Sequence, residues 1–174
     1  MKYYKLIIDG NDTLGGVLYA PSSVPYPIAR DGQEVKNWQS LVLELRDGVY
    51  CHFHACTGGA NIISEEFKKL IESFTGDNNE IEYLPVKVIS KEYGDRIYYI
   101  LHFRKIFDVI DKAKTIYAKD TDVILRVRLD NNKTKNLIIF NSQPAINDVI
   151  VCEDLYKAIK RNHYDLGIEF MLMR

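Results

Sequence analysis

The pattern of hydrophobic and polar residues repeats one combination of elements at two places in the chain. Residues 62–71 align with 150–159, and in both segments a short apolar run leads into residues with helical spacing. Residues 81–84 align in the same way with 168–171, and both have the composition of a strand. The sequence therefore predicts a duplicated helix–strand unit that supplies two principal helices. The apolar stripe of the first helix is Phe67, Leu70, Ile71 and Phe74.

Most of the remaining pattern is typical of strands. Residues 3–8 are rich in β-forming side chains, and residues 41–45, 97–103 and 123–129 alternate with the period of a strand. The last of these has the pattern of a half-buried strand. Only residues 106–117 add a short, weak helix signal. Strands that follow one another with only two clear helices predict an α+β fold with a largely antiparallel sheet.

Two local features make sharper predictions about the sheet. Pro85 lacks a backbone amide, which places residues 81–89 in an edge strand or at a bulge. The residues 46–48 predict a hairpin whose loop has either two or three residues. A two-residue loop would bury His52 and His54 beside the leucines of the preceding strand. We favour the three-residue loop, with both histidines on the polar face, because burying unpaired imidazoles is costly.

Composition limits the kinds of partner. The chain has 174 residues and a net charge of −1, so no strong electrostatic field favours nucleic acid or an anionic membrane. No apolar run is long enough to span a bilayer. Three cysteines at irregular spacing are a poor disulfide framework and indicate a reducing compartment. We therefore expect a cytoplasmic protein that needs no cofactor.

One cluster has the residue types of a metal site. His52, His54 and Cys56 alternate along a strand, so their side chains could share one face. Imidazole and thiolate groups suit zinc or another transition metal. No fourth ligand is apparent nearby, and surface histidines beside an ordinary strand cysteine explain the same pattern. A metal-dependent enzyme centred on His52 and His54 is therefore the alternative hypothesis.

Four residues are candidates for contact with a protein partner. Arg126 and Arg128 share one face of a predicted strand and could bind carboxylates bidentately. Tyr98 and His102 lie on the more polar face of another predicted strand. Aromatic residues and arginines are common anchors of protein interfaces. A solvated outer face is the competing explanation for both pairs.

Several short motifs follow one another in the second half of the chain: Ile63-Ser64-Glu65-Glu66-Phe67, Tyr83-Leu84-Pro85-Val86, Tyr98-Tyr99-Ile100-Leu101, Phe107-Asp108-Val109-Ile110-Asp111, Ile139-Phe140, Ile150-Val151-Cys152-Glu153-Asp154-Leu155 and Gly167-Ile168-Glu169-Phe170. In this order they resemble a family of bacterial immunity proteins from polymorphic-toxin systems, long catalogued as a domain of unknown function. The resemblance covers residues 62–174. Cys152 stands where a capping serine is usual in that family.

The resemblance implies an inhibitor and no enzyme. Such a protein binds a cognate toxin in the cytoplasm and protects the producing cell or its kin, and it brings no catalytic residues to transfer to this sequence. We expect residues 1–174 to form a single α+β domain. Within it, residues 61–174 are the family-like core and residues 1–60 are a more variable region of strands and loops.

Overall fold

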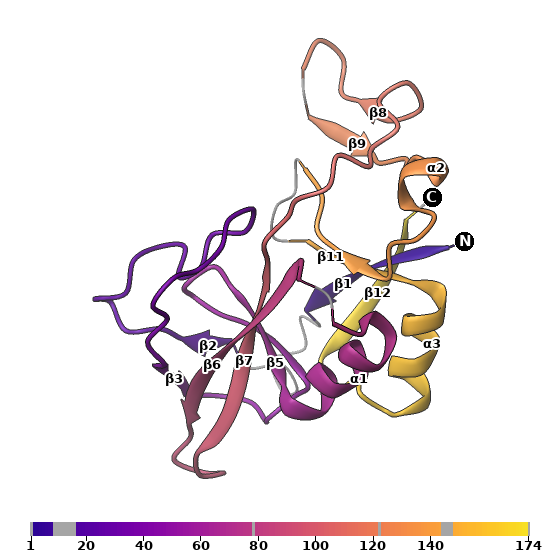
Figure 1. The fold of residues 1–174 in the computed structure, drawn as a ribbon. Coiled ribbons are helices and arrows are strands. Elements are labelled where there is room, and N and C mark those ends of the chain that lie inside the picture. Colours follow the sequence, from indigo (N-terminus) through magenta and orange to yellow (C-terminus); the bar gives the residue numbers. More distant parts are fainter. Residues whose placement is uncertain (1, 9–16, 78, 122, 144–147, 174) are drawn as a thin grey trace.

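The computed structural model describes residues 2–8, 17–77, 79–121, 123–143 and 148–173. Within these residues the chain forms strands in three sheets and three helices, of which α2 is a single turn. In chain order the elements are β1 (Tyr3–Ile8), β2 (Leu18–Tyr19), β3 (Leu41–Leu45), β4 (Phe53–Ala55), β5 (Asn61–Ser64), α1 (Glu65–Thr75), β6 (Ile81–Ile89), β7 (Arg96–Phe103), β8 (Ile116–Tyr117), β9 (Ile124–Arg126), α2 (Asn131–Thr134), β10 (Ile139–Phe140), β11 (Val149–Cys152), α3 (Glu153–Arg161) and β12 (Ile168–Met173). This is an α+β fold with mostly antiparallel sheets, as the sequence predicts (Figure 1).

The duplicated unit is present, and each copy encloses a third strand. In the six-stranded sheet, of order β2-β3-β6-β7-β5-β4, strands β5 and β6 both pair antiparallel with β7. In the four-stranded sheet, of order β10-β11-β1-β12, strands β11 and β12 both pair antiparallel with β1. Each unit is therefore a strand–helix–strand crossover whose two strands are separated by a strand from elsewhere in the chain.

The two principal helices begin with the same backbone geometry but different caps. Ser64 has φ −71° and ψ 164°, and Cys152 has φ −70° and ψ 164°. The Ser64 hydroxyl accepts a hydrogen bond from the amide of Phe67, at 3.2 Å, which satisfies one of the free donors of the first turn. The Cys152 side chain makes no capping hydrogen bond. Cys152 therefore occupies the N-cap position of α3, the position that the resemblance implies for it.

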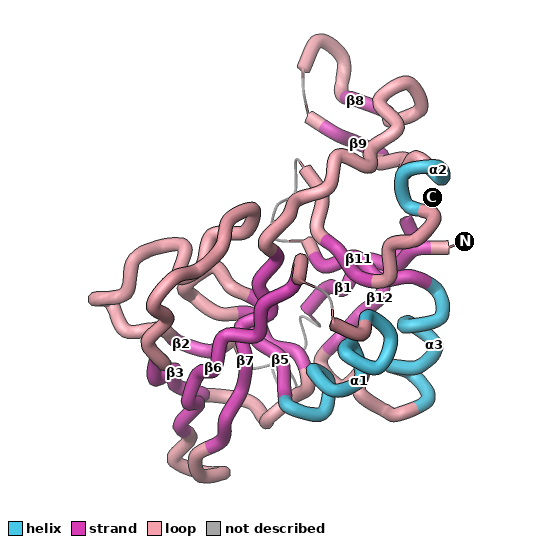
Figure 2. The backbone as a smooth tube through the Cα atoms, in the orientation of Figure 1, coloured by secondary structure: helices cyan, strands magenta, loops and turns pink. Residues whose placement is uncertain are grey.

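Helices α1 and α3 lie side by side and join the two sheets (Figure 2). Phe67 and Ile71 of α1, and Leu155 and Ile159 of α3, are fully buried in one hydrophobic cluster. That cluster also contains residues from both sheets, among them Leu6, Val149 and Val151 of the four-stranded sheet and Ile63, Leu101 and Phe103 of the six-stranded sheet.

A second hydrophobic cluster covers the other face of the six-stranded sheet. It contains Leu43, Val86, Tyr98 and Ile100, all at most 3% exposed. The irregular chain between β2 and β3 packs over this face and contributes Ile28, Val35 and Trp38 among others. The six-stranded sheet is therefore buried on both faces.

Two predictions about this sheet are wrong for reasons that involve distant residues. The segment after β3 forms no hairpin, because β3 pairs in parallel with β6 while β4 lies at the opposite edge. β6 is internal despite Pro85, because β3 pairs only with residues 86–89. The Trp38 indole instead donates to the Pro85 carbonyl oxygen, at 2.9 Å.

The segment between β7 and β10 also differs from expectation. No helix forms over residues 106–117; instead Val109 and Ile110 are buried and Ile110 forms a β-bridge with Leu129. The predicted strand at 123–129 is reduced to β9, which pairs only with β8 in a two-stranded ribbon. Figure 1 shows this ribbon projecting away from the two larger sheets.

Candidate functional site

A groove lies between the β8–β9 ribbon and the four-stranded sheet, on the side of the sheet that α3 does not cover. Tyr4 stacks on Tyr156 of α3, with ring centroids 4.1 Å apart, so the neighbouring residue Lys5 faces the other way. Lys5 pairs with Met171 of β12, and directly paired residues share a face. We call this feature the ribbon groove.

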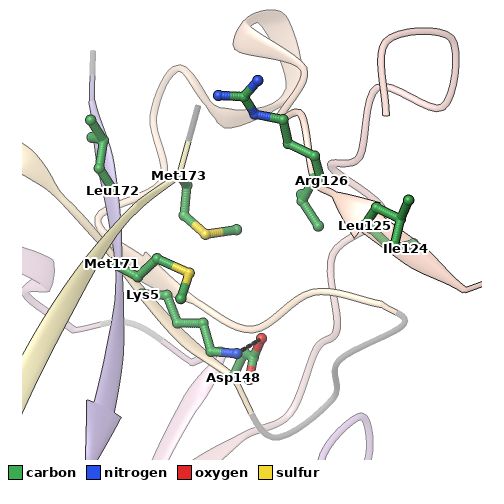
Figure 3. Close-up of a pocket in the computed structure, with 9 residues that line it drawn as sticks. Lys5, Ile124, Leu125, Arg126, Asp148, Met171, Leu172 and Met173 are labelled. Carbon is green, nitrogen blue, oxygen red and sulfur yellow. Dashed lines mark ion pairs between the residues drawn. The ribbon is translucent and has the colours of Figure 1, made fainter. Parts of the chain in front are cut away.

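The ribbon groove consists of two adjoining cavities of about 350 and 210 Å³. Both are lined by Ile124, Val127, Asp148 and Met173. The larger one is also lined by Lys5, Leu125, Arg126, Met171 and Leu172, and the smaller by Ile110, Leu129, Ser142, Gln143 and Ile150. In Figure 3 the side chains of Met171 and Met173 extend from β12 toward the segment that carries Arg126.

The walls of the ribbon groove leave an unusual amount of apolar surface in solvent. Leu125 is 67% exposed and Met171 is 52% exposed. Among the described residues, five of the twelve exposed large hydrophobic side chains belong to the ribbon or to β12: Leu125, Met171 and Leu172, which line the groove, and Ile116 and Tyr117, which form β8. Clustering of this kind marks interaction surfaces, whereas isolated exposed apolar residues are ordinary.

Two of the charged side chains in the groove form an ion pair, and the third does not. Lys5 Nζ lies 2.6 Å from Asp148 Oδ2, so these two charges neutralise each other (Figure 3). Arg126 is exposed and makes no ion pair with any residue that the structure describes. A guanidinium group offers a planar fork of donors that matches a carboxylate. The ribbon groove can therefore hold an apolar group beside a carboxylate.

The structure separates the four partner-contact candidates into two classes. Tyr98 is 3% exposed and its hydroxyl donates to the Cys51 carbonyl oxygen, at 2.9 Å. His102 has no exposed surface. A partner in contact with the folded protein reaches neither side chain. Arg126 lines the ribbon groove, whereas Arg128 is half-buried and lines neither of its cavities.

His102 instead anchors the loop that covers the six-stranded sheet. Its Nδ1 lies 3.0 Å from Asp31 Oδ1, and its Nε2 lies 2.7 Å from the carbonyl oxygen of Gln33 and 3.4 Å from Glu82 Oε2. Burial disfavours the charged imidazole, but these acceptors outweigh that effect and raise the pKa of His102 above its usual value. The imidazole ring thus ties residues 31–33 to β6 and β7.

The metal-site candidates each bind a different partner. His52 Nδ1 lies 2.8 Å from the Ser64 hydroxyl, and burial lowers the pKa of this imidazole even though Glu66 opposes the shift. His54 is 1% exposed, so the prediction that it lies on a polar face is wrong; its Nε2 accepts a hydrogen bond from the amide of Cys51, at 2.9 Å.

The Cys56 thiol accepts a hydrogen bond from the amide of Gly58, at 3.3 Å, while burial raises its pKa. The described residues contain no group of three or more histidine, cysteine or acidic side chains that could hold a metal ion. Nor does any helix in the described part of the chain have the length and apolar character needed to cross a membrane.

Sequence reasoning missed most of the ribbon groove. It identified Arg126 but assigned Leu125 to the buried face of a strand, and it did not single out Met171 or Met173. Alternation along one strand shows which residues share a face, but it does not show which sheet that face meets. No signal in the sequence links residues 124–127 with 171–173.

The fold and the groove define an α+β protein whose distinctive surface suits the binding of another molecule. The sequence profile of the immunity protein family Imm11 matches residues 24–173, and the chain belongs to that family. A search of curated proteins finds no match to the chain. The family match begins well before residue 62, so it includes β3, β4 and most of the loop that covers the six-stranded sheet, which the sequence resemblance had left out.

Proposed function

We propose that this protein binds a cognate secreted bacterial toxin in the cytoplasm and neutralises it without catalysing a reaction. The observation that carries the proposal is the match of the immunity protein family to residues 24–173. The exposed apolar surface around the ribbon groove supports it, because such a surface gains free energy when a partner removes it from water.

Inhibition by binding requires a surface and needs no reaction centre. The toxin is blocked when the immunity protein covers its active site or holds it in an inactive conformation. A net charge of −1 indicates that association does not depend on strong long-range attraction. We therefore expect affinity to depend on a few buried apolar and arginine contacts, with little change in the association rate as salt is raised.

The test is co-expression with the toxin-like product of the neighbouring gene. We expect the toxin alone to arrest growth, co-expression of this protein to restore growth, and the two proteins to purify as a complex. Any activity assay of the purified toxin should then be inhibited at a stoichiometric ratio. Growth arrest that persists while the immunity protein is abundant and folded would reject the proposal.

A further inference from the structure

We infer that the ribbon groove is the surface that receives the toxin, through a toxin segment that places an apolar side chain next to a carboxylate. The inference rests on the proposed function and adds to it the contact surface and the chemistry of the bound segment. Three independent features of the groove lead to it.

The first feature is the shape of the ribbon groove. Its larger cavity, about 350 Å³, is open between β9 and β12 and can accept a large side chain of a partner. Two of its wall residues are methionines, whose unbranched and polarizable side chains adapt their packing to whatever enters.

The second feature is charge. Of the charged side chains that line the larger cavity, Lys5 and Asp148 bind each other, so Arg126 gives the groove a positive charge that no described residue balances. A carboxylate of the partner would bind this guanidinium group bidentately. A basic segment would be repelled, and a purely apolar one would leave the guanidinium group without a counter-charge at the interface.

The third feature is the construction of the ribbon. β8 and β9 pair only with each other, and two-stranded ribbons are only marginally stable without further packing. Leu125, on β9, keeps two thirds of its surface in water although it projects over a cavity. A partner seated in the groove would cover Leu125 and Met171 together and hold the ribbon against the sheet.

The test compares binding of the purified full-length toxin to wild-type protein and to two groove variants, Arg126→Glu and Leu125→Asp. We expect each variant to bind at least about tenfold more weakly, which is typical of residues that anchor an interface. The matched controls are Arg161→Glu, on the exposed end of α3, and Ile97→Asp, at a position in β7 that is 55% exposed. Both controls should bind within about twofold of wild type, because they lie away from the groove.

The charge is tested separately with Arg126→Met, which keeps a long apolar side chain and removes the guanidinium group. Wild-type dissociation should accelerate with salt more steeply than that of Arg126→Met. A photo-crosslinking residue at position 125 should capture a toxin segment that contains an aspartate or glutamate beside an apolar residue. The same crosslinker at position 97 should capture none. A captured segment without an acidic residue would overturn the stated chemistry.

The remaining outcomes separate the two proposals. If wild-type protein binds the toxin and both groove variants bind equally well, the inference fails and the proposed function stands. If wild-type protein does not bind the toxin, both fail. If wild-type protein is a dimer that Leu125→Asp converts to a monomer, a second copy of the chain occupies the groove and the inference is overturned. Unchanged thermal unfolding of every variant excludes misfolding as the cause of lost binding.

Discussion

The two strand–helix–strand units share their local structure but differ in what covers the far side of their sheets. Around α1, the six-stranded sheet is closed on its second face by the chain between β2 and β3, with Ile28 and Trp38 packed into the cluster. Around α3, the four-stranded sheet is covered on its second face by the segment that carries the ribbon and α2. There the closure is incomplete and the ribbon groove remains.

This difference separates a sheet face that is buried from a sheet face that, under the proposed function, is left open to bind a partner. Both helices bury their apolar stripes in one shared cluster, so the helix-covered faces of the two units both contribute to the hydrophobic core. The opposite faces of the two sheets differ in how much apolar surface they leave exposed. One holds residues such as Val86 that have no exposed surface, and the other exposes Leu125 and Met171.

The strongest test of the shared cluster compares Phe67→Ala in α1 with Leu155→Ala in α3. Both side chains are fully buried, and both substitutions should lower the free energy of unfolding by about 3–5 kcal/mol. Urea denaturation should show one transition in each variant, because the two helices share the cluster. Two separated transitions, with only one shifted by each substitution, would show that the units are stabilised independently.

The second test compares the two outer faces. Ile100→Ala removes a residue that is 1% exposed and should cost about 2–4 kcal/mol of unfolding free energy. Leu125→Ala removes a residue that is 67% exposed and should change that free energy by less than about 0.5 kcal/mol. Equal losses would mean that the ribbon packs as a core element, and the contrast between the faces would be rejected.

The two helix caps offer a finer comparison. Ser64→Ala should lower the unfolding free energy by about 1–2 kcal/mol, because the hydroxyl caps α1 and also contacts His52. Cys152→Ser should change it by less than about 1 kcal/mol, since a new capping bond and the burial of a hydroxyl group act in opposite directions. Chemical denaturation of both variants measures the difference, and a larger effect at Cys152 would contradict it.

The smallest expected effect is a pH dependence of the unfolding free energy, which comes from His102 and the loop that covers the six-stranded sheet. The pKa of His102 is raised in the folded protein, so protonation of His102 stabilises the fold. This stabilisation is fully present below the pKa of the unfolded chain, near 6.5, and is lost as pH rises through the folded pKa. Wild-type unfolding free energy should therefore fall with rising pH above 6.5, relative to His102→Gln. Asp31→Asn should flatten the same dependence, since it removes the negative charge of the carboxylate that lies 3.0 Å from His102 Nδ1. Parallel pH profiles for the wild type and both variants would rule out this role for His102.

The sequence predicts the parts of the fold that depend on near neighbours. β1 is marked by its β-forming residues, and α1 and α3 are marked by apolar residues at helical spacing. The position of Cys152 at the start of α3 follows from the family resemblance. The hairpin after β3 is predicted wrongly because β3 pairs in parallel with β6, a contact that no local turn encodes. Pro85 is misassigned because β3 pairs with β6 only at residues 86–89, and no local pattern shows where that long-range pairing begins.

The candidate site shows the same limit. The arginine pattern draws attention to Arg126, but the apolar wall opposite it comes from β12. Burial is also misjudged where a polar residue finds a backbone partner. His54 accepts a hydrogen bond from the Cys51 amide, and this makes its complete burial tolerable.

The position of β1 has a consequence for when the ribbon groove can form during synthesis. This strand precedes every other described strand in the chain, yet it lies between β11 and β12 and pairs with Ile168–Met173 along its whole length. The four-stranded sheet, and with it one wall of the ribbon groove, cannot assemble until that last strand has left the ribosome. Under the proposed function, a chain can therefore bind a toxin through the groove only after β12 has been made and has paired with β1.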